Sequence, residues 1–211
     1  MEPVCYIVGA MDPGPLRFPR PGLIIAADGG YAHLKGQGLA PDIAVGDFDS
    51  LGYIPEKNVV RHPPEKDDTD TMLAIRLGLE RDYGVFVLYG CLGGRLDHAY
   101  ANLQALSFLA ENGARGYLLG PAGEAITVIR DGAIQFPSAC RGIVSVFCPG
   151  GAAEGVYERG LKYVLTDAVV TSGCPLGVSN EFTGQPARIV VRSGELLVMW
   201  SEDAGALLER I

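Results

Sequence analysis

The sequence has no run of basic residues, no C-x-x-C pair and no long apolar segment. Its net charge is −8, and a nucleic-acid-binding protein needs a basic stripe to displace counterions, so we expect no nucleic-acid partner. Its five cysteines are odd in number, which argues against a disulfide framework or a zinc site and favours a reducing compartment. No apolar run approaches the roughly 18 residues that cross a bilayer, so we expect no membrane partner.

The N-terminal apolar run at residues 4–10 has no basic flank and is too short for a signal peptide core with a cleavage site. Together with the cysteines, it predicts a cytoplasmic protein. Hydrophobic residues make up 48% of the chain and charged residues 20%, which favours a packed core over disorder. An acidic protein that binds an anionic nucleotide must gather positive charge locally, from metal ions or from a few Arg and Lys.

Short apolar runs alternate with helical patterns in the first part of the chain. Apolar residues at helical spacing predict helices over residues 69–81 and 97–112, with Asp67 or Asp68 capping the first and Gly113 ending the second. Strands that are apolar on both faces and alternate with helices imply a parallel sheet covered by helices. The predicted strands cover residues 4–8, 23–27, 43–45, 58–61, 85–89 and 117–119.

From about Gly132 the helical spacing fades and short β-rich runs follow. Their spacing, with Gly, Ser, Pro and Asp between them, is typical of a small antiparallel sandwich or barrel. We therefore predict an α/β fold class: an N-terminal domain (residues 1–131) with a mostly parallel sheet and flanking helices, and a C-terminal antiparallel β-sandwich domain (residues 139–211). The β-rich runs are residues 143–147, 163–165, 187–191 and 195–200.

Acidic or glycine-rich loops follow four of the predicted strands. In an open parallel sheet, ligands bind beyond the carboxyl ends of the strands, so we expect a site at this edge. The loops are Asp28-Gly29-Gly30, Asp47-Phe48-Asp49-Ser50, Lys66-Asp67-Asp68-Thr69-Asp70 and the segment from Gly90 to His98.

Asp47 and Asp49 are two residues apart, a spacing that points both side chains the same way on an extended turn. Adjacent carboxylates repel each other unless a cation or a shared proton lies between them. Magnesium takes one or two carboxylates together with water and substrate phosphates. The alternative is a turn cap at Asp47 and a solvated Asp49, but Asp28 and Asp70 at neighbouring strand ends favour a metal site.

Gly93-Gly94-Arg95 lies between a predicted strand and a predicted helix. Glycines let the backbone approach a phosphate, the helix N-terminus attracts anions, and Arg95 adds a bidentate contact. The alternative is an ordinary tight turn. The P-loop pattern and the G-x-G-x-x-G dinucleotide pattern are both missing.

Other candidate residues keep two interpretations each. His98 and Asn102 share a helix face. Either Asp97 caps that helix and His98 is a packed, hydrogen-bonded residue, or they contact the ligand directly. Lys66 either meets a polyphosphate or neutralises its acidic neighbours. Trp200 and Tyr163 either stack on an aromatic substrate or pack in the core.

The ordered series of these motifs resembles the thiamine pyrophosphokinase (thiamine diphosphokinase) family. The resemblance runs from about Asp28 to Trp200, and five blocks in sequence make it specific where one block would not. The blocks are Asp28-Gly29-Gly30, Gly46-Asp47-Phe48-Asp49-Ser50, Lys66-Asp67-x-Thr69-Asp70, Gly93-Gly94-Arg95-x-Asp97-His98, and Gly160-Leu161-Lys162-Tyr163 followed by Gly177-Val178-Ser179-Asn180-Glu181-Phe182.

The resemblance implies transfer of a pyrophosphoryl group from ATP to thiamine, giving thiamine diphosphate and AMP, with Mg²⁺ as cofactor. It also implies a homodimer with sites at the subunit interface. A general base stays open between Asp70, a phosphate oxygen and water. The implied roles are magnesium and phosphate binding by Asp47, Asp49 and Asp70, catalysis by these three and Arg95, nucleotide binding by Asp28, Gly29, Lys66, Thr69, Gly94, Asp97 and His98, and thiamine binding by Ser179 and Asn180.

Two other functions compete with this interpretation. A related pyrophosphokinase acting on another acceptor, such as a hydroxymethylpterin, would share the catalytic half, whereas Ser179-Asn180 favours thiamine. A non-catalytic nucleotide- or thiamine-binding sensor would bind without turnover, whereas the full set of carboxylates favours an enzyme.

Overall fold

The computed structural model describes residues 2–48, 53, 58–61, 68–202 and 204–211. The elements of the first part are β1 (Val4–Val8), β2 (Gly22–Ala27), α1 (Gly30–Gly36), β3 (Ile43–Gly46), β4 (Val59–Arg61), α2 (Asp70–Leu79), β5 (Val85–Tyr89), α3 (Leu96–Glu111), β6 (Arg115–Leu119) and β7 (Glu124–Arg130). Those that follow are β8 (Ala133–Phe136), β9 (Ile143–Phe147), β10 (Ala152–Arg159), β11 (Leu165–Thr171), β12 (Gly177–Glu181), β13 (Ala187–Val190), β14 (Glu195–Ser201) and α4 (Ala204–Arg210).

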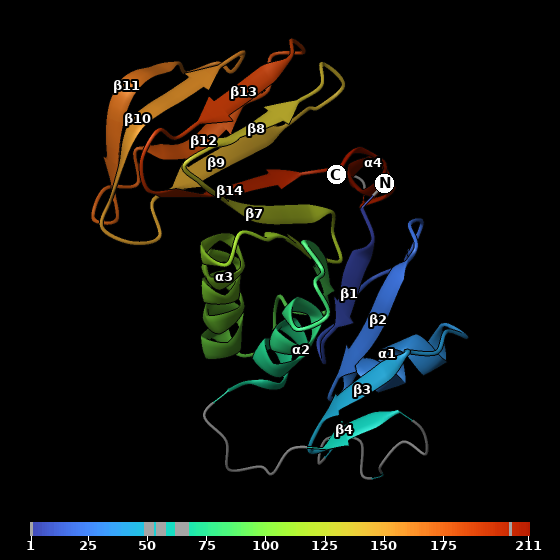
Figure 1. The fold of residues 1–211 in the computed structure, drawn as a ribbon. Helices are drawn as coiled ribbons and strands as arrows, with labels where there is room; N and C mark the ends of the chain where they lie inside the picture. Colours follow the sequence, from blue (N-terminus) through green and yellow to red (C-terminus); the bar gives the residue numbers. More distant parts are fainter. Residues whose placement is uncertain (1, 49–52, 54–57, 62–67, 203) are drawn as a thin grey trace.

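The described strands form a ten-stranded sheet in the order β12-β9-β14-β7-β6-β5-β1-β2-β3-β4, and a four-stranded sheet in the order β11-β10-β13-β8 (Figure 1). β1 pairs in parallel with both β2 and β5, and the parallel part continues to β3 and β4 on one side and to β6 on the other. Every residue of β1 and β5 is buried, as expected for central parallel strands covered on both faces. The α/β fold class is confirmed.

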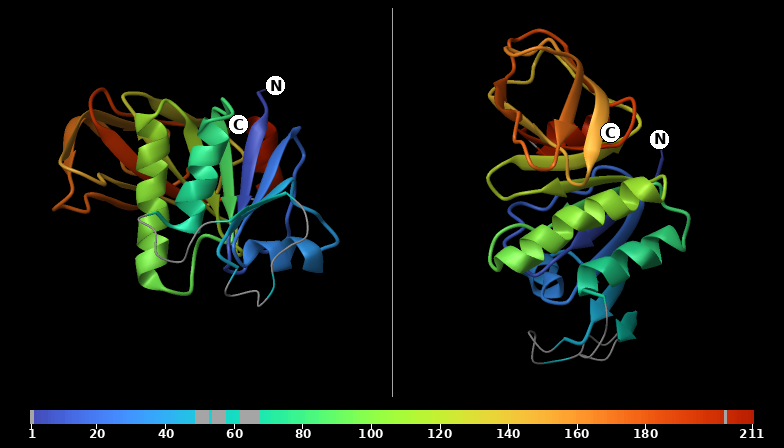
Figure 2. Two further views of the ribbon diagram at one scale, coloured as in Figure 1. Left: turned by 60° about the horizontal axis from the view of Figure 1, so that its bottom comes forward. Right: turned by 90° about the vertical axis from the view of Figure 1, so that its left-hand side faces the viewer.

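Helices cover the two faces of the parallel strands unequally. α2 and α3 pack on one face, where Ile75 and Leu106 meet alternate residues of the strands such as Ile7 and Phe86 (Figure 2). α1 contributes Leu34 to the opposite face. Because successive side chains of a strand point to opposite faces, each strand contributes to two separate apolar clusters, one on each face of the sheet.

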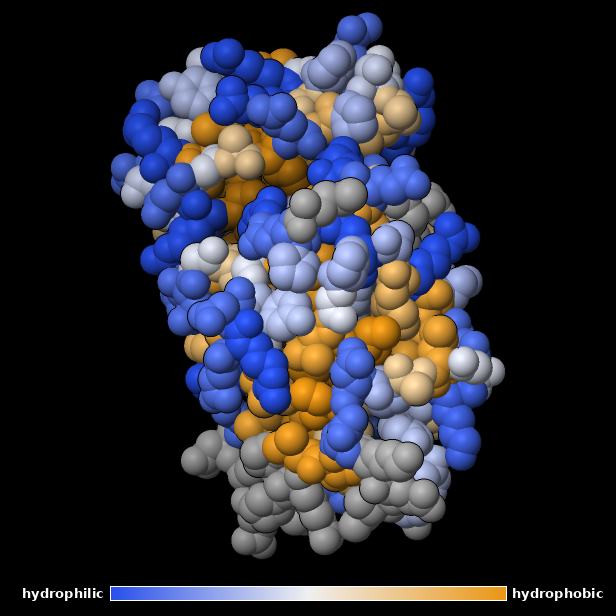
Figure 3. Space-filling view, turned by 45° about the vertical axis from the view of Figure 1, so that its right-hand side comes forward, coloured by the Kyte–Doolittle hydropathy of each residue, from blue (hydrophilic) through white to orange (hydrophobic). Residues whose placement is uncertain are grey.

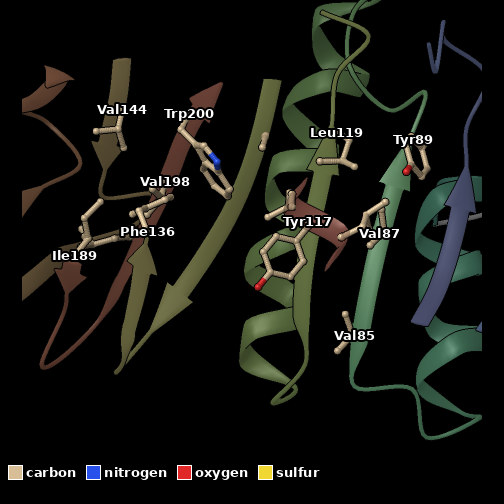
Figure 4. Packing of buried hydrophobic residues seen from close by; sticks show 14 of the residues in the cluster. Val85, Val87, Tyr89, Tyr117, Leu119, Phe136, Val144, Ile189, Val198 and Trp200 are labelled. Atoms are coloured by element: carbon tan, nitrogen blue, oxygen red, sulfur yellow. The ribbon is translucent and has the colours of Figure 1, made fainter. Parts of the chain in front are cut away.

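The second part of the chain is a sandwich in which the antiparallel four-stranded sheet faces the β12-β9-β14-β7 end of the large sheet (Figure 1). Phe136 and Trp200 pack edge to face between the sheets, with ring centroids 5.3 Å apart, beside Ile189 and Val198 (Figure 4). Trp200 is a core residue, because only 3% of it is exposed. The Tyr163 side chain, in contrast, lies on the surface.

β14 joins the two parts of the chain. It pairs antiparallel with β7 on one side and with β9 on the other, so the large sheet passes without a break from the parallel strands into the sandwich. The turn from β7 to β8 coincides with the predicted end of the first domain at residue 131. The division into residues 1–131 and 139–211 stays a prediction.

Three local predictions have clear outcomes. The prediction that Asp67 or Asp68 caps α2 is wrong: Thr69 is the cap, and its Oγ1 accepts a hydrogen bond from Met72 N at 3.2 Å. Asp68 instead forms an ion pair with Arg76 at 2.7 Å. Gly113, with a φ of +74°, follows the C-cap of α3 as predicted.

The predicted strand at residues 163–165 is wrong except for its last residue, since β11 begins at Leu165. The backbone N–H and C=O of Tyr163 bond to the side-chain amide of Asn180 instead of to a neighbouring strand. The side chain of Asn180 thus takes the place of a neighbouring strand's backbone. The apolar pattern of residues 163–165 does not reveal this side-chain partner.

Candidate active site

The chain leaves β1 toward β2 on one side, whereas β5 lies on the other side, so the strand order reverses between β1 and β5. Ligands of open α/β sheets bind beyond the carboxyl ends of the strands at such a point. A pocket of about 290 Å³ lies here. It is lined by Gly9, Ala10 and Met11 after β1, Ala27 and Asp28 at β2, Asp70 and Thr71 of α2, Gly90 after β5, and Arg95, His98 and Asn102 at α3.

Two glycines bring the loops after β1 and β5 into contact. Gly9 N donates to Tyr89 O at 2.8 Å, and Met11 N donates to Gly90 O at 3.0 Å. Gly90 has a φ of +61°, and a Cβ built on it would lie 2.6 Å from Met11 O. Only glycine fits at that position, so these loops form a pocket wall of bare backbone.

Asp28 reaches the pocket from a strained backbone position. Its φ is +46°, a conformation that non-glycine residues adopt rarely and mostly where structure or function demands it. Asp28 N donates to Val45 O at 2.8 Å, and a Cβ on Gly46 would lie 3.2 Å from Asp28 Cα. The close packing of the loops after β2 and β3 thus determines where the Asp28 carboxylate lies.

Asp70 supplies a second carboxylate from a different element. It occupies the first turn of α2, directly after the Thr69 cap, and lines the same pocket as Asp28. Asp47 is half-buried at the end of β3 and follows Gly46, but it is not among the residues that line the pocket. Asp49 and Lys66 lie outside the described residues, and their predicted roles stay predictions.

The positive side of the pocket comes from the start of α3. Arg95 occupies the N-cap position without a side-chain cap bond, and the helix that follows is 16 residues long. Backbone N–H groups and the helix dipole at such an end attract anions. Arg95 and Asp97 form an exposed ion pair at 2.6 Å, which lowers the pKa of Asp97 and raises the pKa of Arg95.

His98 and Asn102 share one face of α3, as predicted, and both line the pocket. The His98 side chain is exposed rather than packed, whereas Asn102 is buried and its Nδ2 donates to Cys91 O at 2.9 Å. That bond ties α3 to the loop after β5. Burial raises the pKa of the Cys91 thiol to about 12, so Cys91 is neutral near pH 7 and not a nucleophile.

The structure brings Asp28, Asp70, Arg95 and His98 together from three of the four predicted site segments. Gly29, Thr69, Gly94 and Asp97 are chain neighbours of lining residues without lining the pocket themselves. The pocket residues that the sequence prediction missed are Gly9, Ala10, Met11, Ala27 and Thr71. Gly9 follows the first strand just as Asp28 follows the second, so its position was the available signal.

The donor set at the pocket fits magnesium. Among the described residues, no group of three His, Cys, Asp or Glu side chains is placed to hold a metal ion without further ligands. Magnesium, however, keeps several waters and binds through one or two carboxylates and substrate phosphates. Asp70 offers one such carboxylate at the pocket, and the Asp28 carboxylate beside it adds negative charge.

Ser179 and Asn180 lie on β12 in the sandwich, not at the pocket. Figures 1 and 2 show β12 at the opposite end of the molecule from the carboxyl ends of β1, β2 and β5. Ser179 is exposed at a φ of +58°, where the register between β12 and β9 shifts. Asn180 is 4% exposed.

These features define a class: α/β proteins that bind an anionic ligand at the switch point of a parallel sheet and carry an additional antiparallel sandwich. A comparison with family models identifies the member of that class. The model described as "Thiamin pyrophosphokinase, catalytic domain" matches residues 19–118, and the model described as "Thiamin pyrophosphokinase, vitamin B1 binding domain" matches residues 133–196. The chain belongs to the thiamin pyrophosphokinase family, and its enzymatic function is that of a thiamine diphosphokinase.

Individual relatives agree with this family. The chain is 28% identical over 191 residues to the thiamine pyrophosphokinase of Bacillus subtilis (strain 168), covering 86% of this chain and 88% of that protein. The crystal structure of a thiamin pyrophosphokinase family protein from Enterococcus faecalis is 28% identical, with a TM-score of 0.80 over 94% of this chain and 99% of that one. The crystal structure of the Bacillus subtilis enzyme, 24% identical, has the same fold, with a TM-score of 0.83 over 95% and 99% of the two chains.

Proposed function

We propose that the pocket at the switch point is where this chain binds ATP and transfers its pyrophosphoryl group to thiamine, giving thiamine diphosphate and AMP. The observation that carries the proposal is the meeting of two carboxylates, Asp28 and Asp70, with Arg95 in one pocket. Acidic and basic groups together suit a polyphosphate that arrives with a cation.

Phosphoryl transfers of this kind depend mainly on positioning and on neutralising charge. In the proposal, the bare backbone around Gly9 and Gly90 lets the phosphates approach closely, and the N-terminus of α3 faces them. Arg95 exchanges its contact with Asp97 for a phosphate oxygen. That exchange costs little, because solvent screens an exposed ion pair such as this one.

Asp47, Asp49 and Asp70 are the residues that would hold magnesium. When bound, the metal neutralises the charge that develops on the phosphate oxygens. We assign the remaining nucleotide contacts to Asp28, Gly29, Lys66, Thr69, Gly94, Asp97 and His98. A general base is not assigned.

Thiamine would be contacted by the Ser179–Asn180 segment of a partner subunit in a homodimer. Two observations support this arrangement. Within one chain the segment lies far from the pocket (Figures 1 and 2). The sandwich also exposes apolar side chains such as Ile143 and Val178. Figure 3 shows apolar surface in the upper, β-rich part of the molecule. Light scattering at micromolar concentration tests the dimer: the mass of a single chain would contradict it.

The described helices include none long and apolar enough to cross a bilayer. The cytoplasmic location stays a prediction, and fractionation of cells that express the protein tests it.

The activity itself is tested by incubating the protein with magnesium, ATP and thiamine and separating the products. AMP and thiamine diphosphate in equal amounts support the proposal, whereas ADP, or nucleotide turnover without thiamine, contradicts it.

A further inference from the structure

A carboxyl group lies inside the sandwich, away from the pocket described above. Glu158 on β10 is 1% exposed, and its strand is paired on both sides, with β11 and β13. Burying a carboxyl group in an apolar core is costly unless hydrogen bonds compensate for lost hydration. Burial accordingly raises the pKa of Glu158.

The partner of Glu158 is Asn180, which belongs to the other sheet. Asn180 Nδ2 donates to Glu158 Oε2 at 2.6 Å, so this bond connects β10 of the four-stranded sheet with β12 of the ten-stranded sheet. Both residues are at least nine-tenths buried. Water therefore competes little with the bond, and the bond restricts how the Asn180 amide is oriented.

The other hydrogen bonds of the Asn180 amide hold the turn before β11. Asn180 Nδ2 also donates to Tyr163 O at 2.7 Å, and Asn180 Oδ1 accepts from Tyr163 N and from Glu181 N, both at 2.9 Å. The amide thus has two acceptors and two donors around it, which is its full capacity. Without Glu158, one amide hydrogen loses its buried acceptor and the amide is free to rotate away from Tyr163.

The turn before β11, which the Asn180 amide holds, carries side chains that are exposed on the surface. Tyr163 is 60% exposed although its backbone is bonded on both sides, and Lys162 Nζ lies 5.5 Å from the centre of its ring. Ser179, the chain neighbour of Asn180, is exposed in its left-handed conformation. The Tyr163 ring and the Ser179 hydroxyl therefore depend on the same buried amide for their positions.

We propose that Glu158 is a positioning residue for thiamine: acting through Asn180, it holds the Tyr163 backbone and the Ser179 segment in the geometry that receives the substrate. The inference rests on the proposed thiamine contact of the Ser179–Asn180 segment. Glu158 lies beneath the surface and does not touch the substrate, so it acts on thiamine affinity and not on the ATP pocket.

The test compares Glu158→Leu, which removes the acceptor, with Glu158→Gln, which keeps one. We expect Glu158→Leu to raise the KM for thiamine about tenfold, the equivalent of one lost hydrogen bond of about 1.4 kcal/mol, with the KM for ATP and kcat within twofold. Glu158→Gln should restore the KM for thiamine to within about threefold. Glu154→Gln, on the exposed side of the same strand, is the control.

If Glu158→Leu does not fold, Glu158→Asp replaces it, because the shorter carboxylate does not reach Asn180 and the same rise is expected. An unchanged KM for thiamine in the folded variant would overturn the inference. So would a fall in kcat with a rise in both KM values, which is the result of a general structural defect.

Amide hydrogen exchange of the unliganded protein separates this inference from the proposed activity. Tyr163 N and Glu181 N should exchange at least tenfold faster in Glu158→Leu than in the unmodified chain, while amides of β1 and β5 stay unchanged. Unmodified protein without thiamine turnover contradicts the proposed function alone, whereas unchanged exchange at Tyr163 and Glu181 contradicts the role of Glu158.

Discussion

Asp28 and Asp70 come from different parts of the chain, the loop after β2 and the first turn of α2, and line the same pocket. Their meeting could be predicted from the sequence, since Asp28 and Asp70 follow, along the chain, the strands β2 and β4 of one parallel sheet. The pairing of Glu158 with Asn180 could not, since these residues are 22 positions apart and belong to different sheets. A buried polar residue reveals its partner only in the folded chain.

Asp70→Asn tests the acidic side of the pocket. The amide keeps the size of the side chain but removes the negative charge that a metal–polyphosphate complex requires. We expect kcat/KM for ATP to fall by at least about 100-fold, since charge stabilisation in the transition state is worth several kcal/mol. Steady-state assays at saturating thiamine measure this fall.

The control for Asp70→Asn is Asp82→Asn, an exposed residue in the turn after α2 with a φ of +60°. Asn tolerates that conformation, so activity and thermal stability should both stay unchanged. Near-normal turnover by folded Asp70→Asn protein would show that Asp70 has no role in the site.

Glu158→Gln tests how the buried carboxyl affects stability. Since burial raises the pKa of Glu158 above its ordinary value of 4.5, the folded state holds this proton more tightly than the unfolded state does. The contribution of Glu158 to stability is therefore fully present below pH 4.5 and is lost as pH rises through the raised pKa. Glutamine does not titrate, so the stability of Glu158→Gln relative to the unmodified chain should increase from pH 4.5 upward.

Urea unfolding at several pH values measures this difference, with Glu154→Gln as the exposed control on the same strand. A difference between Glu158→Gln and the unmodified chain that is constant with pH would show that Glu158 titrates alike in the folded and unfolded states.

Among the elements, the parallel strands could be predicted because their apolar runs are continuous, and the helices α2 and α3 because each buries one face at regular spacing. Several sandwich strands could not. In β10, Gly155 and Glu158 interrupt the apolar alternation, although both are buried. In β12 three polar residues, Ser179 to Glu181, follow one another beside a register shift. Long-range pairing, not local pattern, determines these strands.

The loops after β1 and β5 contact each other at the pocket, and Gly90→Ala tests this contact. A side chain at a φ of +61° costs about 1–2 kcal/mol, and its Cβ would lie 2.6 Å from Met11 O. We expect lower thermal stability and a KM for ATP raised at least about tenfold, because one misplaced loop weakens several phosphate contacts.

The matched control is Gly36→Ala at the end of α1, where an added Cβ meets nothing within 4 Å. Ala favours a helix by about 0.5–1 kcal/mol over Gly, so this variant should be as stable as the unmodified chain and fully active. Equal thermal stability and an equal KM for ATP in Gly90→Ala and Gly36→Ala would contradict the special role of Gly90.

The whole molecule is held together by a sheet that both parts of the chain share. β14 comes from the end of the sequence but pairs with β7, and one apolar cluster continues from Val4 and Val8 to Phe136 and Trp200. We expect the two parts to unfold together, since neither part completes this core without the other.

The single tryptophan makes this test possible. Trp200 fluorescence reports on the sandwich, and circular dichroism at 222 nm reports mainly on α2 and α3. Both probes should give the same midpoint in urea. A sandwich transition well separated from the helical one would show two independently folding domains.

The location of the nucleotide is the central claim, and backbone NMR shifts during titration with magnesium and a non-hydrolysable ATP analogue test it most directly. We expect saturable, magnesium-dependent shifts centred on the amides of Gly9, Gly90 and Arg95, and little change in β10 and β13. Saturable shifts confined to the sandwich, with Gly9, Gly90 and Arg95 unchanged, would contradict the site.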